Sequence, residues 1–150
     1  MITLPALDDL LVPLPKEEID VLEKQYNSEG NFASVQSSFN YAWALIKQPD
    51  AENQRRGVAI LTQLYKTAPP RRRETLFYLS AGCYKLGDYT AARKYADVLL
   101  NHEPTNPQVN QLRQAIEDKL NKEAMFGFMI VSGAVALGAT ILGVALRKKR

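Results

Sequence analysis

The C-terminal end constrains this chain most, because residues 124–146 contain no charged side chain. A helix of this length reaches about 35 Å at about 1.5 Å per residue. The hydrocarbon core of a bilayer is about 30 Å thick, so the segment can span it with some tilt. A basic tail follows directly, formed by Arg147, Lys148, Lys149 and Arg150. We therefore expect residues 124–146 to anchor the chain in a lipid bilayer, with the N-terminal part in the cytosol.

The charge and the rare residue types exclude several classes of function. The formal net charge is +3, and since the basic tail supplies +4, the remainder carries −1, which argues against nucleic-acid binding. Cys83 is the only cysteine and His102 the only histidine, so an internal disulfide is excluded and a metal cluster has little basis. A glycine-rich phosphate loop is also missing. We expect neither an enzyme nor a protein that binds a cofactor or metal.

Residues 15–123 are predicted to form an all-α domain, because no segment alternates apolar and polar residues long enough for a strand. Prolines, glycines and capping residues divide the segment into six helices. We expect these over residues 15–30, over 32–47, between Asp50 and Pro69, over 71–86, over 89–101, and from a cap at Thr105 to residue 123.

Residues 1–14 precede this domain as an apolar arm. Prolines and acidic residues argue against a regular helix through it. An arm this apolar is expected to lie on another surface rather than in water. The candidate contact residues are Leu4, Leu7, Leu10 and Leu11.

The predicted fourth and fifth helices carry the pattern of a 34-residue tetratricopeptide repeat (TPR). The Gly87–Asp88 turn separates two antiparallel helices, and the small side chain of Ala92 permits their close approach. The second and third helices form a weaker copy, in which Gly57 corresponds to Ala92 and Ala42 to Ser80. We therefore expect two tandem hairpins, with the first and sixth helices capping the open ends.

The first helix of each hairpin is expected to line a concave face. If Leu79 and Cys83 point to the core, residues about 100° around the helix point to this neighbouring face. The same offset in both hairpins selects an apolar groove formed by Phe39, Trp43, Ile46, Phe77, Ala81 and Tyr84. These side chains either pack against adjacent helices or form a groove for an apolar segment. Such a segment is either a partner helix or the chain's own arm.

Together with the anchor and basic tail, three stretches carry a resemblance to the mitochondrial fission 1 family: residues 39–43, 71–74 and 82–87. The resemblance covers nearly the whole chain, and the long arm is similar to that of fungal members. It implies a six-helix domain with two TPR-like hairpins and a single-pass receptor in the mitochondrial outer membrane. It further implies recruitment of a WD-repeat adaptor and, through it, a dynamin-related GTPase for mitochondrial fission. In such proteins the arm lies over the concave groove and takes part in adaptor binding, and the basic tail serves targeting.

Several alternatives stay open from the sequence. Moderately apolar anchors with basic flanks resemble those of peroxisomes as well as mitochondria, and small residues within the anchor leave homo-oligomerisation open. An import or chaperone-docking TPR receptor would need several basic side chains around a carboxylate, and the groove offers mainly Lys47 and Lys85. The Arg71–Arg73 cluster is interpreted either as a solvated first helical turn or as a docking patch for acidic groups.

Overall fold

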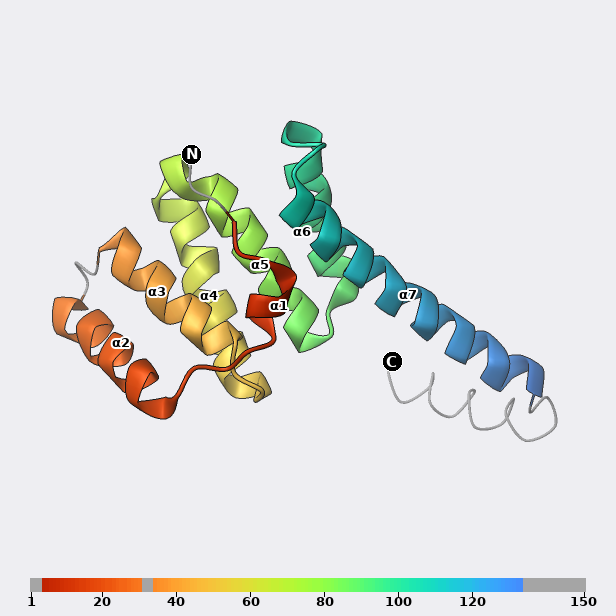
Figure 1. Ribbon diagram of the computed structural model, residues 1–150, viewed down its shortest axis with the longest axis horizontal. Coiled ribbons are helices and arrows are strands. Elements are labelled where there is room, and N and C mark those ends of the chain that lie inside the picture. The colour runs from red at the N-terminus through yellow and green to blue at the C-terminus, as the bar shows by residue number, and fades with distance from the viewer. Residues whose placement is uncertain (1–3, 31–33, 134–150) are drawn as a thin grey trace. The chain divides into compact units, whose positions relative to one another are not determined.

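The computed structural model describes residues 4–30 and 34–133, and every regular element in these residues is helical (Figure 1). The all-α prediction is confirmed, and the six expected helices are present. They are preceded by the single turn of α1 (Leu7–Leu10), and a 3₁₀ turn, η2 (Pro69–Arg71), leads into α5. The helices are α2 (Lys16–Glu29), α3 (Val35–Ile46), α4 (Ala51–Thr67), α5 (Arg72–Leu86), α6 (Tyr89–His102) and α7 (Pro107–Gly133).

Short polar side chains define where the helices begin. Asp50 and Asp88 accept hydrogen bonds from backbone N–H groups in the first turns of α4 and α6, as predicted. Ser34 caps α3 in the same way, so this helix begins later than residue 32. The start of α7 corrects another prediction. Asn106, not Thr105, accepts hydrogen bonds from the first turn, because its amide oxygen reaches two backbone N–H groups there.

The two hairpins, α3–α4 and α5–α6, are held together at corresponding positions. In the second hairpin, the Ser80 hydroxyl donates a hydrogen bond of 2.8 Å to the carbonyl oxygen of Ala92. In the first, a Cβ atom on Gly57 would lie 2.8 Å from the carbonyl oxygen of Ala42. Both contacts join the residues that the sequence aligned between the repeats. The weaker first repeat is therefore a true structural copy of the second.

A packing node joins the first hairpin to α5. Ile46 is fully buried at the end of α3. A Cβ atom on Gly82 of α5 would lie 2.7 Å from Cγ2 of Val58 and 3.1 Å from Cδ1 of Ile46. The missing side chain at residue 82 therefore lets three helices meet. The surrounding core is built by apolar side chains that include Leu45, Leu61, Leu79, Ala96, Leu99, Val109, Leu112 and Ile116.

α2 is attached more loosely than the other helices of the domain. Its predicted buried stripe, Ile19, Leu22 and Tyr26, is only half-buried, and no residue of α2 is fully buried. An aromatic contact holds it to α3, with the rings of Tyr26 and Tyr41 centred 5.1 Å apart. The outer side of α2 consequently faces solvent.

The chain divides into two compact units, residues 1–116 and 117–150, and α7 belongs to both. In the first unit, the start of α7 buries Val109, Leu112 and Ile116, and Arg113 forms an ion pair of 2.7 Å with Asp97 of α6. Among the described residues, no helix is both long enough and apolar enough to cross a membrane. Most of the predicted anchor and all of the basic tail lie outside those residues.

Cys83 is expected to make the domain less stable at alkaline pH. Burial, with a smaller contribution from Asp88, raises the pKa of its thiol from 9.0 to about 11. The unfolded thiol therefore ionises before the folded one, so we expect the free energy of unfolding to be unaffected below pH 9 and to fall between pH 9 and 11. Urea unfolding at pH 8 and pH 10 measures this decrease. Cys83→Ala should reduce it by on the order of 1 kcal/mol.

Comparing wild type with Cys83→Ala cancels the contribution of the buried tyrosines to the pH dependence of stability. The pKa values of Tyr41, Tyr78 and Tyr95 are also raised, chiefly by burial, and these residues remain in the variant. An equal decrease in stability for wild type and Cys83→Ala would show that the thiol does not contribute.

Candidate functional site

One face of the domain combines aromatic side chains from α3 and α5 with basic side chains at or next to the ends of these helices. The indole of Trp43 stacks on the ring of Tyr78, with centroids 5.0 Å apart, and Phe39 meets Tyr78 edge-on at 5.3 Å. The guanidinium of Arg71 lies 4.6 Å above the ring of Phe39. Tyr78 and Lys85 share one side of α5 with Arg71, the residue before this helix, because the three are seven residues apart. Aromatic rings thus occupy the centre of this face.

Two lysines form the other end of the same face. The side chain of Lys47 is only 7% exposed, and its Nζ lies 3.2 Å from Oδ1 of Asp9 in the arm. Nζ of Lys85 donates a 3.4 Å hydrogen bond to the carbonyl oxygen of Lys47, and burial lowers the pKa of Lys85. A buried ammonium group is costly without a partner. The carboxylate of Asp9 supplies that partner, so the arm and the face depend on one another.

The described part of the N-terminal arm, residues 4–14, lies against the folded domain. Figure 1 shows it crossing α5 before it turns towards α2. Leu4 and Leu10 are 3% and 2% exposed, Leu7 is half-buried, and Leu11 is 56% exposed. Asp9 is close enough to contribute to the raised pKa of Tyr78, whose main cause is burial. We call the surface formed by Phe39, Trp43, Lys47, Arg71, Tyr78 and Lys85 the arm-covered face.

The structure separates the six predicted groove residues. Phe39 and Trp43 belong to the arm-covered face, whereas Ile46 lies in the packing node described above. Phe77 and Ala81 are buried, at 2% and 1% exposure.

Tyr84 also lies away from the arm-covered face. It is half-buried, with its ring 5.8 Å from that of Tyr89. Tyr78, not Phe77, stacks on Trp43, and a binding role for Phe77, Ala81 and Tyr84 stays a prediction. The sequence signal for Tyr78 is the spacing of seven between Arg71, Tyr78 and Lys85.

Each arginine of the Arg71–Arg73 cluster contacts another residue of the domain, although Arg72 is exposed. Arg71 forms an ion pair of 3.2 Å with Glu74, and Arg72 lies 4.9 Å above the ring of Tyr65. Arg73 donates a 2.9 Å hydrogen bond to Glu103 in the loop after α6, and this bond lowers the pKa of the Glu103 carboxyl. The three guanidinium groups therefore join the start of α5 to Glu74, to Tyr65 of α4 and to Glu103 after α6.

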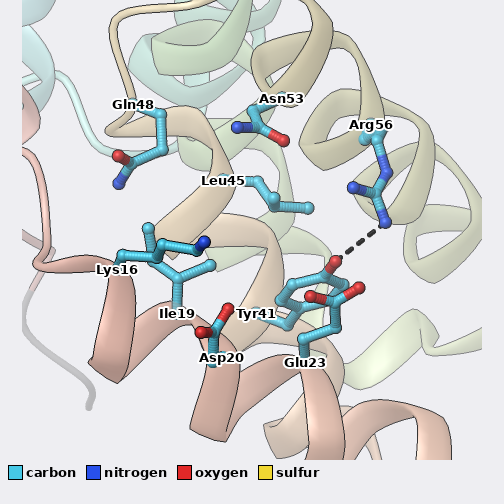
Figure 2. A pocket seen from close by; sticks show the side chains of 9 residues that line it. All are labelled: Lys16, Ile19, Asp20, Glu23, Tyr41, Leu45, Gln48, Asn53 and Arg56. Atoms are coloured by element: carbon cyan, nitrogen blue, oxygen red, sulfur yellow. Dashed lines mark hydrogen bonds between the residues drawn. The ribbon is translucent and has the colours of Figure 1, made fainter.

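A separate cleft of about 300 Å³ lies where α2 meets α3 and α4 (Figure 2). Lys16, Asp20 and Glu23 of α2 line one side. Across the cleft, Nη2 of Arg56 donates a 2.8 Å hydrogen bond to the Tyr41 hydroxyl, which Figure 2 marks with a dashed line. Burial raises the pKa of Tyr41, although Arg56 opposes the shift. The cleft is lined by both acidic and basic groups, so it shows no preference for a ligand of one charge. It is consistent with the loose attachment of α2.

Comparisons with known proteins identify the family of this fold. Family models described as the Fis1 N-terminal and Fis1 C-terminal tetratricopeptide repeats match residues 36–68 and 73–125. A mitochondrial fission 1 protein from Yarrowia lipolytica is 57% identical over 147 residues, which cover 98% of this chain and 96% of that protein. The chain belongs to the mitochondrial fission 1 (Fis1) family. The family prediction made from sequence is confirmed.

Solved Fis1 structures share the fold. The crystal structure of Fis1 from Saccharomyces cerevisiae has a TM-score of 0.80 and 48% identity, covering 85% of this chain and 99% of that one. A crystal structure of yeast Fis1 in complex with an Mdv1 fragment, containing the N-terminal extension and coiled-coil domains, has a TM-score of 0.79 at 48% identity and covers 83% of this chain and 98% of that one. The two Fis1 repeat models correspond to hairpin α3–α4 and to α5, α6 and much of α7.

Proposed function

We propose that this Fis1-family chain is a non-catalytic, tail-anchored receptor of the mitochondrial outer membrane. It recruits a WD-repeat adaptor and, through that adaptor, a dynamin-related GTPase that divides mitochondria. The stacked pair of Trp43 and Tyr78 beside the arm is the observation that carries the binding role. Support also comes from yeast Fis1, which forms a complex with a fragment of Mdv1.

The binding role follows from what remains accessible on the arm-covered face. Trp43 and Tyr78 are half-buried with the arm in place, so part of each ring stays open to a partner. Tryptophan, tyrosine and arginine are enriched among the few residues that dominate binding energy in protein interfaces. We propose that a helix of the adaptor packs its apolar face beside the arm and contacts the rings of Trp43 and Tyr78. Leu4 and Leu10 then serve the complex indirectly, by holding the arm in position.

Membrane attachment is proposed from the sequence, through residues 124–146 and the basic tail. Anchoring one partner raises the local concentration of the other at the surface. A chaperone-docking role fits less well, because a carboxylate clamp would need Lys47 and Lys85 together. Lys47 is already paired with Asp9.

Complementation tests the proposed function directly. Expression of the full chain in Saccharomyces cerevisiae cells that lack Fis1 should restore division of the mitochondrial network. Val135→Arg places a charge in the middle of the predicted anchor and should abolish both membrane retention and rescue. Fluorescence imaging of mitochondria and peroxisomes, with an N-terminal tag on the protein, measures both effects.

A conservative substitution provides the control for this experiment. Val135→Leu should anchor and rescue like the wild type. Networks that stay undivided despite normal protein levels would contradict the fission role, and rescue by Val135→Arg would contradict the anchor.

A further inference from the structure

A second cleft lies away from the arm-covered face, between the start of α5 and the end of α6. Its volume is about 430 Å³. Leu76, Val98 and Leu99 form an apolar floor, and Val98 is 41% exposed although it is a large apolar residue. Neither the aromatic pair nor the arm contributes a lining residue, so the proposed adaptor site does not account for this cleft.

The rim of this cleft carries positive charge. Nε of Arg72 donates a 2.9 Å hydrogen bond to the carbonyl oxygen of Tyr65, which fixes the guanidinium over the Tyr65 ring at the edge of the cleft. His102 lies on the opposite rim, with Nδ1 3.0 Å from the carbonyl oxygen of Val98. The Arg73–Glu103 pair neutralises itself. Arg72 therefore offers a positioned cation next to an apolar floor.

The outer side of α2 has the complementary chemistry. Val21 is 65% exposed, and Leu22 lies beside it, half-buried. Glu17 and Glu18 lie one turn before Val21 on the same side of the helix, since residues three or four apart share a helix face. Within the described part of the chain, neither carboxylate pairs with a basic side chain. An exposed apolar residue flanked by free carboxylates matches an apolar floor flanked by a guanidinium.

We propose that two copies of this chain associate by docking the outer side of α2 from one copy into the α5–α6 cleft of the other. Val21 and Leu22 cover the floor formed by Leu76 and Val98, and Glu18 approaches Arg72. One surface lies on α2 and the other on the α5–α6 hairpin, so the contact is heterologous and can continue from copy to copy. One helix face buries less area than a stable dimer needs, so the association is weak in solution and gains strength where copies are concentrated on a membrane.

Sedimentation velocity over a range of concentrations tests this contact. A fragment of residues 1–126 is suitable, because residues 1–116 form a compact unit and the matched yeast structure corresponds to 85% of this chain. The weight-average sedimentation coefficient should rise between about 5 µM and about 500 µM for wild type. Glu18→Arg should weaken the association at least about tenfold, because it places two cations together. This residue is exposed on α2, so its replacement leaves the core intact.

Charge exchange and a matched control complete the test. Arg72→Glu alone should weaken association as much as Glu18→Arg does, and the double variant should recover it. Arg55→Glu makes the same charge change at an exposed site on α4 and should have no effect. A concentration-independent wild type, or a double variant that stays as weak as the singles, would overturn the proposal. Binding of an adaptor fragment should be unaffected by Glu18→Arg, so the two proposed sites can fail separately.

Discussion

Replacement of Trp43 by alanine is expected to weaken binding of the adaptor fragment about 30-fold to 1,000-fold. The indole lies at the centre of the arm-covered face and stacks on Tyr78 at 5.0 Å. Truncation of a central aromatic residue in an interface typically costs about 2–4 kcal/mol, which corresponds to this range. Isothermal titration of residues 1–126 with an Mdv1-type fragment, containing the N-terminal extension and coiled coil, measures the change.

Two tyrosines on α5 provide a matched comparison for this prediction. Tyr78→Ala should reduce affinity nearly as much as Trp43→Ala, because it removes the stacking partner. Tyr84→Ala should change affinity little, since its ring packs towards Tyr89 at 5.8 Å, on another side of the helix. The sequence pattern alone selected Tyr84 and omitted Tyr78. If Tyr84→Ala proves the more damaging variant, the arm-covered face is not the binding surface.

Gly57→Val is expected to lower the free energy of unfolding by about 3 kcal/mol. A Cβ atom at this position would lie 2.8 Å from the carbonyl oxygen of Ala42 and 2.8 Å from Cγ1 of Ile46. The first of these atoms belongs to the backbone of α3, so relief requires the two helices to separate. The gain in helix propensity over glycine, about 0.5 kcal/mol, is too small to compensate. Urea unfolding of residues 1–126, followed by circular dichroism, measures the loss.

An exposed position on the same helix separates this steric effect from helix propensity. Ala59→Val introduces the same side chain two residues further along α4, where it faces solvent. It should cost less than about 1 kcal/mol, since only the lower helix propensity of valine acts there. Similar losses for the two variants would mean that the close contact at Gly57 does not limit the packing of the hairpin.

The helices were predictable from sequence because local chemistry determines their ends. Asp50 and Asp88 cap helices as expected, and Gly87 ends α5 with a φ of 83°, in the left-handed region that glycine adopts readily. The cap of α7 was placed one residue too early. Thr105 and Asn106 are both good capping residues, and only the fold of the preceding loop decides between them.

The candidate site was less predictable, because it depends on the rotation of α5 about its own axis. A shift of one residue turns a helix by about 100°, which exchanges Tyr78 for Phe77. The pairing of Lys47 with Asp9 was equally inaccessible. The two residues are far apart in sequence, and nothing local indicates that the arm returns to the end of α3. Periodicity located the helices, and contacts between distant segments decided which side chains share a face.

The contact between the two helices differs chemically in the two hairpins, and this restricts which substitutions each hairpin can accept during evolution. Duplicated units usually keep interchangeable parts, yet here one seam is closed by the absence of a side chain at Gly57 and the other by a hydroxyl group at Ser80. A side chain that fits at one of these positions is therefore damaging at the aligned position of the other hairpin. The two hairpins therefore cannot exchange side chains at these aligned positions without loss of packing.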